Sequence, residues 1–209
     1  MSTANDAEIR RQIVEYGKSI FDRGLTGGST GNISVRTDSG FLMTPTGSSM
    51  GRLDPDRLCE FDSNGAHVGG DAPTKESVLH LAVYAQRPDA QAVVHLHSTH
   101  SVAVSCLEEI DPKNVLPPIT AYYVMRVGTL PLVPFYPPGD KELANAVGAL
   151  ARDHHSILLA HHGLVVAGKS LASAVDAVEE LEETAKLYLM LRNTEYRTLT
   201  DAQVRQTSG

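Results

Sequence analysis

The 209-residue sequence has no tryptophan, only four phenylalanines, and two cysteines, Cys59 and Cys106. Two isolated cysteines cannot build the disulfide framework of a small secreted domain or a zinc site made of paired cysteines. We therefore expect both to be free thiols buried as small hydrophobic side chains. No apolar stretch is long enough for a signal peptide or a membrane span, which favours a cytoplasmic protein with no membrane partner.

Dense clusters of basic residues are also absent. The formal net charge is −7, and no block of Lys and Arg offers the footprint that a nucleic-acid backbone requires. We expect no nucleic-acid partner, and any bound phosphate should sit in a local pocket. The hydrophobic share of 42% and the length are typical of one soluble globular domain. We predict a single domain over residues 1–209, with a polar and loose tail from about residue 194.

The spacing of apolar residues predicts the elements of this domain. Helices are expected over residues 7–25, 76–86, 99–107, 141–153 and 171–192, and strands over 33–35, 41–43, 92–96, 157–160 and 164–166. The prolines from Pro117 to Pro138 favour strands or connectors over helices between them. Because helices and strands interleave irregularly, we predict an α/β fold with a mixed, mainly antiparallel central sheet and helices on both faces.

Histidines gather where two of these strands end. His95 and His97 stand two residues apart, so they point to the same face of the sheet and can share one ion. A catalytic zinc typically takes three protein ligands, and His161 or His162, before Gly163, could supply the third. The glycine would let the backbone turn sharply away from the histidines. The alternative is that these histidines only bond to the backbone or to solvent.

A carboxylate and two loops complete the candidate site. Glu76 opens the predicted helix 76–86, where it could either cap the helix or act as a general acid or base, and the sequence leaves both roles open. The loops at 27–32 and 44–49 offer N–H groups and hydroxyls that could together hold a phosphate, although each alone could be an ordinary turn. Lys75 adds a cation that could meet a phosphate or a carboxylate.

These pieces occur in a recognisable order along the chain. They are Gly-Ser-Thr-Gly-Asn-Ile-Ser at 28–34, Thr-Pro-Thr-Gly at 44–47, Glu76, Ala-Val-Val-His-Leu-His at 92–97 and His-His-Gly at 161–163. Together they resemble the class II aldolase and adducin-like family over nearly the whole chain. The resemblance implies a three-layer α/β/α fold, a homotetramer with active sites near subunit contacts, and a bound Zn²⁺ or another divalent metal such as Mn²⁺ or Co²⁺.

The same resemblance assigns roles to individual residues. The matching metal ligands are His95, His97 and His162, and Glu76 matches the catalytic acid or base. The positions that match phosphate contacts are Asn32, Thr46, Gly47 and Thr74. Tyr122 matches the catalytic tyrosine, acting in the same or a neighbouring subunit. Lys75 departs from the fuculose-phosphate aldolase pattern, which has a serine there, and this disfavours fuculose phosphate as the substrate.

Further motifs resemble the 3-oxo-tetronate 4-phosphate decarboxylases of this family. They include Pro-Thr-Lys-Glu at 73–76, Tyr-Tyr-Val-Met-Arg-Val-Gly at 122–128 and Pro-Pro-Gly-Asp at 137–140. This resemblance implies a small phosphorylated sugar acid as substrate, which loses carbon dioxide through an enediolate that the metal stabilises and yields dihydroxyacetone phosphate. Lys75 would orient the substrate carboxylate. Glu76 would protonate the enediolate, and burial with a nearby like charge could keep it protonated, whereas the positive charge of the metal would act the other way.

Three other functions fit the family. The first is an aldolase that cleaves a ketose 1-phosphate such as L-fuculose 1-phosphate, and the second is a pentulose-phosphate 4-epimerase. The third is a scaffold without catalysis, as in the adducin-like branch. The intact set of three histidines and Glu76 argues against the scaffold, which would need no metal ligands.

Overall fold

The computed structural model describes residues 4–207, which form an eight-stranded sheet of order β4-β3-β2-β1-β5-β8-β7-β6. In chain order the strands are β1 (Asn32–Arg36), β2 (Gly40–Met43), β3 (Cys59–Asp62), β4 (His67–Gly69), β5 (Ala92–Leu96), β6 (Leu132–Val133), β7 (Ser156–Leu159) and β8 (Gly163–Gly168). Among these strands every neighbouring pair is antiparallel except β6 and β7, which run parallel.

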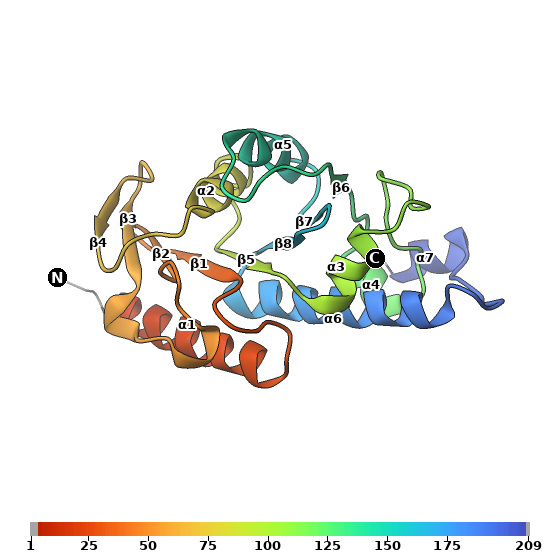
Figure 1. Cartoon of the computed structure of the whole chain (residues 1–209), viewed down its shortest axis with the longest axis horizontal. Coiled ribbons are helices and arrows are strands. Elements are labelled where there is room, and N and C mark those ends of the chain that lie inside the picture. Colours follow the sequence, from red (N-terminus) through yellow and green to blue (C-terminus); the bar gives the residue numbers. More distant parts are fainter. Residues whose placement is uncertain (1–3, 208–209) are drawn as a thin grey trace.

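Helices cover both faces of this sheet. They are α1 (Ala4–Asp22), α2 (Ser77–Gln86), α3 (Thr99–Ser105), α4 (Ala121–Arg126), α5 (Lys141–Ala151), α6 (Leu171–Leu191) and α7 (Asp201–Thr207). Figure 1 shows α2 and α5 above the sheet, with α1 and the long α6 below it. The predicted α/β fold, with three layers and a mixed, mainly antiparallel sheet, is confirmed.

Strand β5 lies in the middle of the sheet and is buried along its whole length. Its side chains alternate between two apolar cores, as the period of a strand requires. Val94 belongs to the core that contains Val178 of α6, whereas Val93 belongs to the core that contains Leu79 of α2 and Val147 of α5. A side chain two positions after Val93 therefore faces the layer formed by α2 and α5.

Several sequence predictions are confirmed at the level of single elements. The hairpin of β1 and β2, the central strand β5 and the pair β7 and β8 all lie where apolar runs predicted them. Gly24 ends α1 in the left-handed region, with φ of 72°. The N–H of Leu25 donates to the carbonyl of Ile20 at 3.1 Å, which is the bond of a glycine-terminated helix end.

Two predictions are wrong. The proline-rich segment contains the helix α4, because its prolines flank the helix rather than interrupt it and the Thr120 hydroxyl caps its first turn by accepting from Tyr123 N–H at 3.0 Å. Cys106 is exposed rather than buried, since it follows the last turn of α3 on the surface. Cys59 is buried as predicted, and burial raises the pKa of its thiol to about 11.

The ends of the sheet and of the chain were not foreseen. Strands β3 and β4, at one edge, carry too few alternating apolar residues to be predicted. In the polar C-terminal segment, residues 201–207 form α7, which contacts α4, and Leu199 N–H donates to the Pro118 carbonyl at 2.9 Å. Residues 208 and 209 of the predicted tail lie outside the described residues, as do residues 1–3 of the predicted domain.

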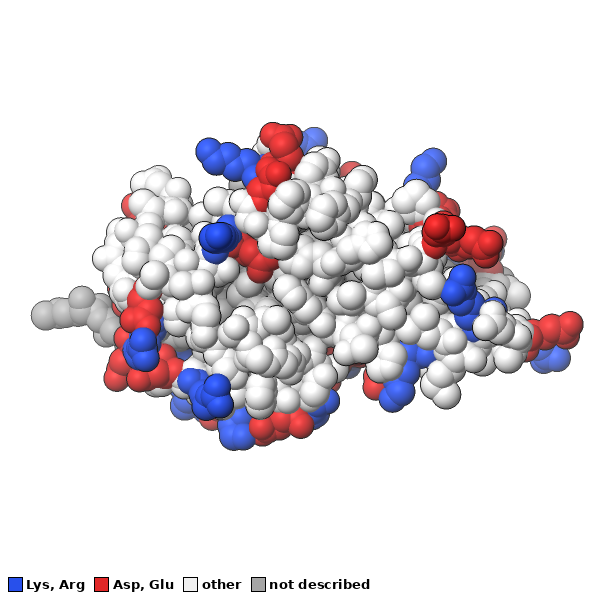
Figure 2. All heavy atoms as spheres, viewed as in Figure 1, with Lys and Arg blue, Asp and Glu red and all other residues white. Residues whose placement is uncertain are grey.

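The surface agrees with the charge argument. On the face shown in Figure 2, Lys and Arg alternate with Asp and Glu around the rim, and the centre of that face is mostly uncharged. No continuous basic surface is visible there. In the part of the chain that the structure describes, no helix is both long enough and apolar enough to cross a membrane.

Candidate metal and proton-transfer site

Two of the predicted ligands come from β5 and the residue that follows it. His95 is fully buried on the side of the sheet that faces α2, and His97 lies just beyond the end of the strand on the same side. Their Nε2 atoms are 3.0 Å apart. His95 Nδ1 lies 2.8 Å from the Leu164 carbonyl oxygen of β8. Since that oxygen can only accept, His95 carries its proton on Nδ1 and presents a bare Nε2 to the site.

The third histidine comes from the turn between β7 and β8. His162 is buried, whereas His161 is exposed and adopts φ of 56°. The left-handed residue that turns the chain is therefore His161, and the predicted reason for Gly163 is wrong. Gly163 is required because β5 lies so close that a Cβ at this position would be 2.2 Å from the Leu96 carbonyl oxygen. Of the two histidines that the sequence left open, the structure directs His162 into the cluster.

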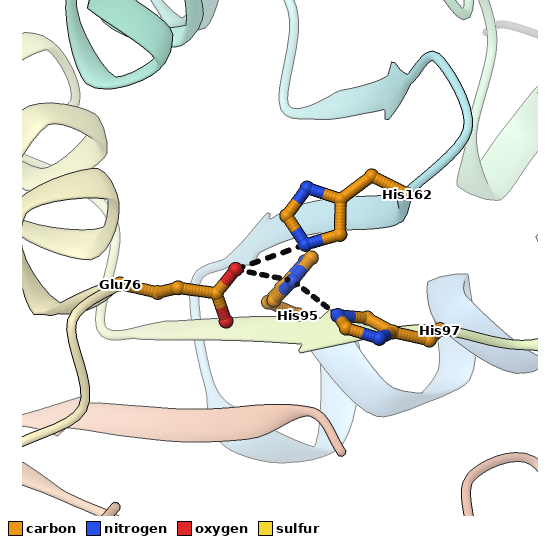
Figure 3. Close-up of side chains that lie close together, drawn as sticks. All are labelled: Glu76, His95, His97 and His162. Atoms are coloured by element: carbon orange, nitrogen blue, oxygen red, sulfur yellow. Dashed lines mark hydrogen bonds and ion pairs between the residues drawn. The ribbon is translucent and has the colours of Figure 1, made fainter. Parts of the chain in front are cut away.

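Glu76 reaches the same point from the layer of helices above the sheet. It stands at the N-terminus of α2, but its side chain makes no capping hydrogen bond. Its Oε1 lies 2.9 Å from His162 Nε2 and 3.3 Å from His95 Nε2. Its Oε2 accepts a hydrogen bond of 2.8 Å from the side-chain amide of Asn32 on β1. The capping interpretation is therefore wrong, and the carboxylate faces the imidazoles (Figure 3).

The environment sets the charges of these groups. Burial acts to raise the pKa of Glu76, but the contact with His162 and the hydrogen bond from Asn32 outweigh it and hold the pKa well below its usual range. The expectation that burial and a like charge would keep Glu76 protonated is wrong, because its nearest neighbours are imidazoles. Burial, followed by the influence of His95 and His162, lowers the pKa of His97 to about 4. At neutral pH His97 is therefore an uncharged imidazole, the form that binds metals.

The cluster fits a divalent metal. One ligand atom each from Glu76, His95, His97 and His162 lies within 4.8 Å of all the others. Donors placed tetrahedrally at zinc–nitrogen distances are about 3.4 Å apart, close to the separations between these atoms. Glu76 Oε1 and both ring nitrogens of His162 are buried, and despite the 2.9 Å between Oε1 and Nε2 none of the three has a partner with hydrogen-bond geometry among the described residues. Such atoms are costly to bury unless an ion or another group satisfies them.

The predicted phosphate loops lie next to this cluster. Gly31 packs so closely on β5 that a Cβ there would be 2.9 Å from the His95 carbonyl oxygen. The N–H of Thr46 donates to the Ala72 carbonyl at 3.0 Å, which brings the second loop against the segment that leads to Thr74. Gly47 adopts φ of 67°, as an exposed turn glycine. The structure thus gathers both loops around the start of α2.

Lys75 and Tyr122 differ in their relation to the cluster. Lys75 is exposed beside Glu76, and no acidic side chain within residues 4–207 forms an ion pair with it. Tyr122 lies on α4, which packs on α6 on the opposite face of the sheet, and 61% of its surface is exposed. Its ring contacts the guanidinium of Arg126. Tyr122 is therefore not part of the metal cluster of its own chain.

Sequence reasoning missed a buried polar layer behind Glu76. His80 and Tyr84 follow Glu76 on α2 at intervals of four residues, and they meet Ser34 of β1. The signal was present in the sequence. Residues four apart share one face of a helix, and Asn32 and Ser34, two apart, share one face of a strand.

Comparisons with known proteins agree with this architecture. The model of the family described as Class II Aldolase and Adducin N-terminal domain matches residues 11–189. A 3-oxo-tetronate 4-phosphate decarboxylase of Haemophilus influenzae is 47% identical over 201 residues, covering 96% of each chain. An L-fuculose phosphate aldolase of the same organism is 38% identical over 194 residues, covering 91% of this chain and 86% of its own. The crystal structure of YgbL from Escherichia coli, described as an aldolase, epimerase or decarboxylase, superposes with a TM-score of 0.95 at 45% identity, covering 98% of this chain and 99% of YgbL.

Proposed function

Because this chain belongs to the class II aldolase and adducin family, we propose that it is a metal-dependent carboxy-lyase acting on 3-oxo-tetronate 4-phosphate. The products would be dihydroxyacetone phosphate and carbon dioxide. One observation carries the choice of substrate. Several relatives named 3-oxo-tetronate 4-phosphate decarboxylase are 45–48% identical to this chain over nearly its whole length.

The substrate has the bonds that this chemistry needs. Its carboxylate is attached to carbon 2, which bears a hydroxyl, and carbon 3 is a ketone. When the bond between carbons 1 and 2 breaks, carbon dioxide leaves and the electron pair stays on carbon 2, where the ketone delocalises it. Carbon 2 then takes up one proton and becomes the hydroxymethyl group of dihydroxyacetone phosphate. The site must therefore bind two anionic groups and deliver a proton to one carbon.

We assign the metal to His95, His97 and His162, with Glu76 close enough to approach it. Zn²⁺ is our first choice, because three imidazoles with an open position are typical of catalytic zinc, and Mn²⁺ or Co²⁺ are the alternatives. A divalent ion held there would supply a Lewis acid for the ketone. The fixed tautomer of His95, set by its contact with the Leu164 carbonyl, prepares the Nε2 lone pair for this role.

Glu76 is the group that carries the proton to carbon 2. Its Oε1 faces the imidazoles, and its Oε2 is held by Asn32, so the carboxylate has a fixed orientation beside the reacting atoms. Since its neighbours keep it ionised, it must first collect a proton from water, which supplies the one proton that each decarboxylation consumes. It then delivers that proton to carbon 2 as a general acid.

The anionic groups of the substrate are assigned to the residues at the start of α2 and the two loops. We propose that Lys75 orients the carboxylate, because it is exposed, precedes Glu76 in the chain and has no ion-pair partner in residues 4–207. The phosphate would be bound by Thr46, Gly47 and Thr74. Asn32 would contribute through the one side-chain N–H that its hydrogen bond to Glu76 leaves free.

The proposed assembly is a homotetramer, in which Tyr122 of one subunit acts at the site of a neighbour. Two observations support this assignment: Tyr122 lies on the face of the sheet opposite the metal cluster, and its side chain is largely exposed. A phosphorylated substrate, which does not cross membranes freely, fits a cytoplasmic enzyme.

The second candidate is an aldolase that releases an aldehyde instead of carbon dioxide. It is favoured by the L-fuculose phosphate aldolase relative at 38% identity. The two reactions leave the same electron pair next to a ketone, so the same metal and proton carrier serve both. They differ in the departing group, and only the decarboxylase substrate carries the carboxylate that Lys75 would bind.

The deciding experiment offers the metal-loaded protein three substrates separately. These are 3-oxo-tetronate 4-phosphate, L-fuculose 1-phosphate and L-ribulose 5-phosphate. We expect equal amounts of carbon dioxide and dihydroxyacetone phosphate from the first substrate and little turnover of the other two. Turnover of a sugar phosphate alone, without carbon dioxide, would mean that the decarboxylase assignment is wrong.

A further inference from the structure

Behind Glu76 lies a layer of polar side chains that the proposed reaction does not yet use. His80 and Tyr84 stand one and two turns after Glu76 on α2, facing Asn32 and Ser34 of β1. His80 and Ser34 are fully buried, and Asn32 and Tyr84 are each 4% exposed. Polar groups at this depth cost stability unless they are hydrogen-bonded, so their arrangement is under strong physical constraint.

From Ser34 to Glu76 these side chains form one continuous chain of hydrogen bonds, and the Tyr84 hydroxyl is bonded to the Ser34 backbone beside its start. The Tyr84 hydroxyl donates to the Ser34 carbonyl at 3.0 Å and also lies 3.0 Å from the Ser34 hydroxyl. The Ser34 hydroxyl lies 2.7 Å from His80 Nδ1. His80 Nε2 contacts the Asn32 side-chain oxygen, and the Asn32 amide nitrogen donates to Glu76 Oε2 at 2.8 Å.

The carboxylate of Glu76, at one end of this chain, determines which atom donates and which accepts in each hydrogen bond. An ionised carboxylate only accepts hydrogen bonds, so Asn32 must turn its NH₂ group toward Glu76 and its oxygen toward His80. The oxygen also only accepts, so His80 must carry its proton on Nε2. Burial lowers the pKa of His80 to about 3, which leaves a neutral ring with one N–H and a bare Nδ1 that accepts from Ser34. From the Ser34 hydroxyl to Asn32, every side-chain donor therefore points toward Glu76.

We propose that His80 is a positioning residue of this site: by donating from Nε2 to Asn32, it fixes the amide that holds Glu76 toward the three imidazoles. The oxygen and nitrogen ends of an amide have nearly the same shape, so packing alone does not select between them. Without His80 the Asn32 oxygen would be a buried acceptor with no donor, and the amide would turn or shift to find one. Glu76 would then lose the hydrogen bond from Asn32 that fixes its Oε2 atom.

This inference rests on the proposed role of Glu76 as proton carrier, and its test uses two polar variants of similar size. His80→Gln places an amide nitrogen near the position of Nε2 and keeps the donor to Asn32. His80→Asn ends near the position of Nδ1, so it keeps contact with Ser34 but cannot reach Asn32. We expect His80→Asn to lower kcat 10- to 100-fold, as is typical for residues that orient catalytic groups, with little change in KM or bound metal. His80→Gln should stay within a few-fold of the unaltered protein.

Two results would overturn the proposal. Equal activity losses in the two variants would show that His80 matters only for packing. Loss of metal in His80→Asn would show that the substitution disturbs the metal ligands rather than the orientation of Glu76. Circular dichroism and urea unfolding check that both variants fold. Tyr84→Phe, which removes the hydroxyl bonded to the Ser34 backbone but none of the bonds from Ser34 to Glu76, should reduce kcat less than His80→Asn does.

A second readout does not depend on turnover. Neutron diffraction from a crystal of the unaltered protein locates deuterium atoms directly. We expect deuterium on His80 Nε2, none on Nδ1, and the ND₂ group of Asn32 facing Glu76. Deuterium on Nδ1, or the Asn32 oxygen facing Glu76, would overturn the proposal even if the protein decarboxylates its substrate. If diffraction gives the expected positions but no substrate turns over, the proposed function fails and the hydrogen-bond chain stands.

Discussion

Glu76 is kept ionised by its neighbours, and this limits the role it can have in catalysis. Burial alone would keep Glu76 protonated, but the contact with His162 and the hydrogen bond from Asn32 favour the ionised carboxylate. Loss of carbon dioxide from a carboxylate consumes one proton in each turnover. Glu76 must therefore collect and release a proton in every cycle, and an uncharged isostere could not do so.

Glu76→Gln is expected to retain metal while kcat falls about 10²- to 10⁴-fold, the range typical of general acid–base catalysis. Glutamine keeps the shape of the side chain but cannot cycle a proton. Dihydroxyacetone phosphate formation and elemental analysis measure the two effects. Glu183→Gln, at an exposed position on α6, is the matched control and should change neither. Full turnover by Glu76→Gln would be incompatible with the role given to this residue.

Lys75→Met tests which anion this lysine binds. If Lys75 holds the substrate carboxylate, KM for 3-oxo-tetronate 4-phosphate should rise about 10- to 100-fold, the value of a lost hydrogen bond between charged groups. Product inhibition by dihydroxyacetone phosphate, which has no carboxylate, should be unchanged. Lys169→Met serves as the control for loss of an exposed positive charge. Equal weakening of substrate and product would mean that Lys75 binds the phosphate instead.

The sequence predicted the members of the cluster better than their mutual arrangement. The spacing of His95 and His97 was enough to place both on one face, because a strand repeats every two residues. The choice between His161 and His162 depends on one backbone angle at His161, which apolar patterning does not encode. The contact between His80 and Asn32 joins positions 48 residues apart, so it became visible only once α2 was packed on β1.

Among the strands, β8 approaches β5 so closely that only glycine is tolerated at position 163. Gly163→Ala is expected to destabilise the protein by about 1–3 kcal/mol or more, as overpacking of backbone against backbone requires. Leu96 immediately precedes the proposed ligand His97, so a shift of the Leu96 backbone would displace that ligand and lower the amount of bound metal as well. Urea unfolding measures the first effect and elemental analysis the second.

Gly148→Ala is the control, because here the same replacement is expected to stabilise the protein rather than destabilise it. In α5 the nearest atom to an added Cβ is the Cβ of Ala82 at 3.6 Å, an ordinary contact. Alanine should therefore stabilise this helix by about 0.5–1 kcal/mol. A Gly163→Ala variant as stable as Gly148→Ala would contradict the described approach of β8 to β5.

Elements with a strong apolar pattern were predictable, and those without one were not. Strand β5 has five consecutive buried residues, and its predicted limits agree with the structure. Helix α4 has only six residues, too few for a helical apolar pattern to outweigh the surrounding prolines, and it begins at the Thr120 cap. Strands β3 and β4 gain their structure from pairing at the sheet edge rather than from local preference.

The proposed tetramer makes a prediction for mixtures of two inactive chains. If Tyr122 acts at a neighbour's site, Tyr122→Phe and Glu76→Gln should each be impaired alone. Co-expressed chains that mix at random should regain about a quarter of full activity, because one site in four combines both native residues in a cyclic assembly. Activity per tetramer, with the assembly confirmed by light scattering, is the measurement.

The control mixture is Glu76→Gln with His162→Ala, two changes within one chain's cluster. No mixed assembly of these chains contains an intact site, so no recovery is expected. Recovery here, or its absence in the Tyr122 mixture when tetramers form, would contradict a site shared between subunits.

The proposed active site depends most directly on one metal ion held by imidazoles from the ends of β5 and β7. Elemental analysis of purified protein should find about one divalent metal per chain, as three histidine ligands imply. His95→Ala, His97→Ala and His162→Ala should each lose most of it, whereas His161→Ala, next to a ligand but exposed, should retain it. Full metal content in the three ligand variants, or loss in His161→Ala alone, would contradict the proposed centre.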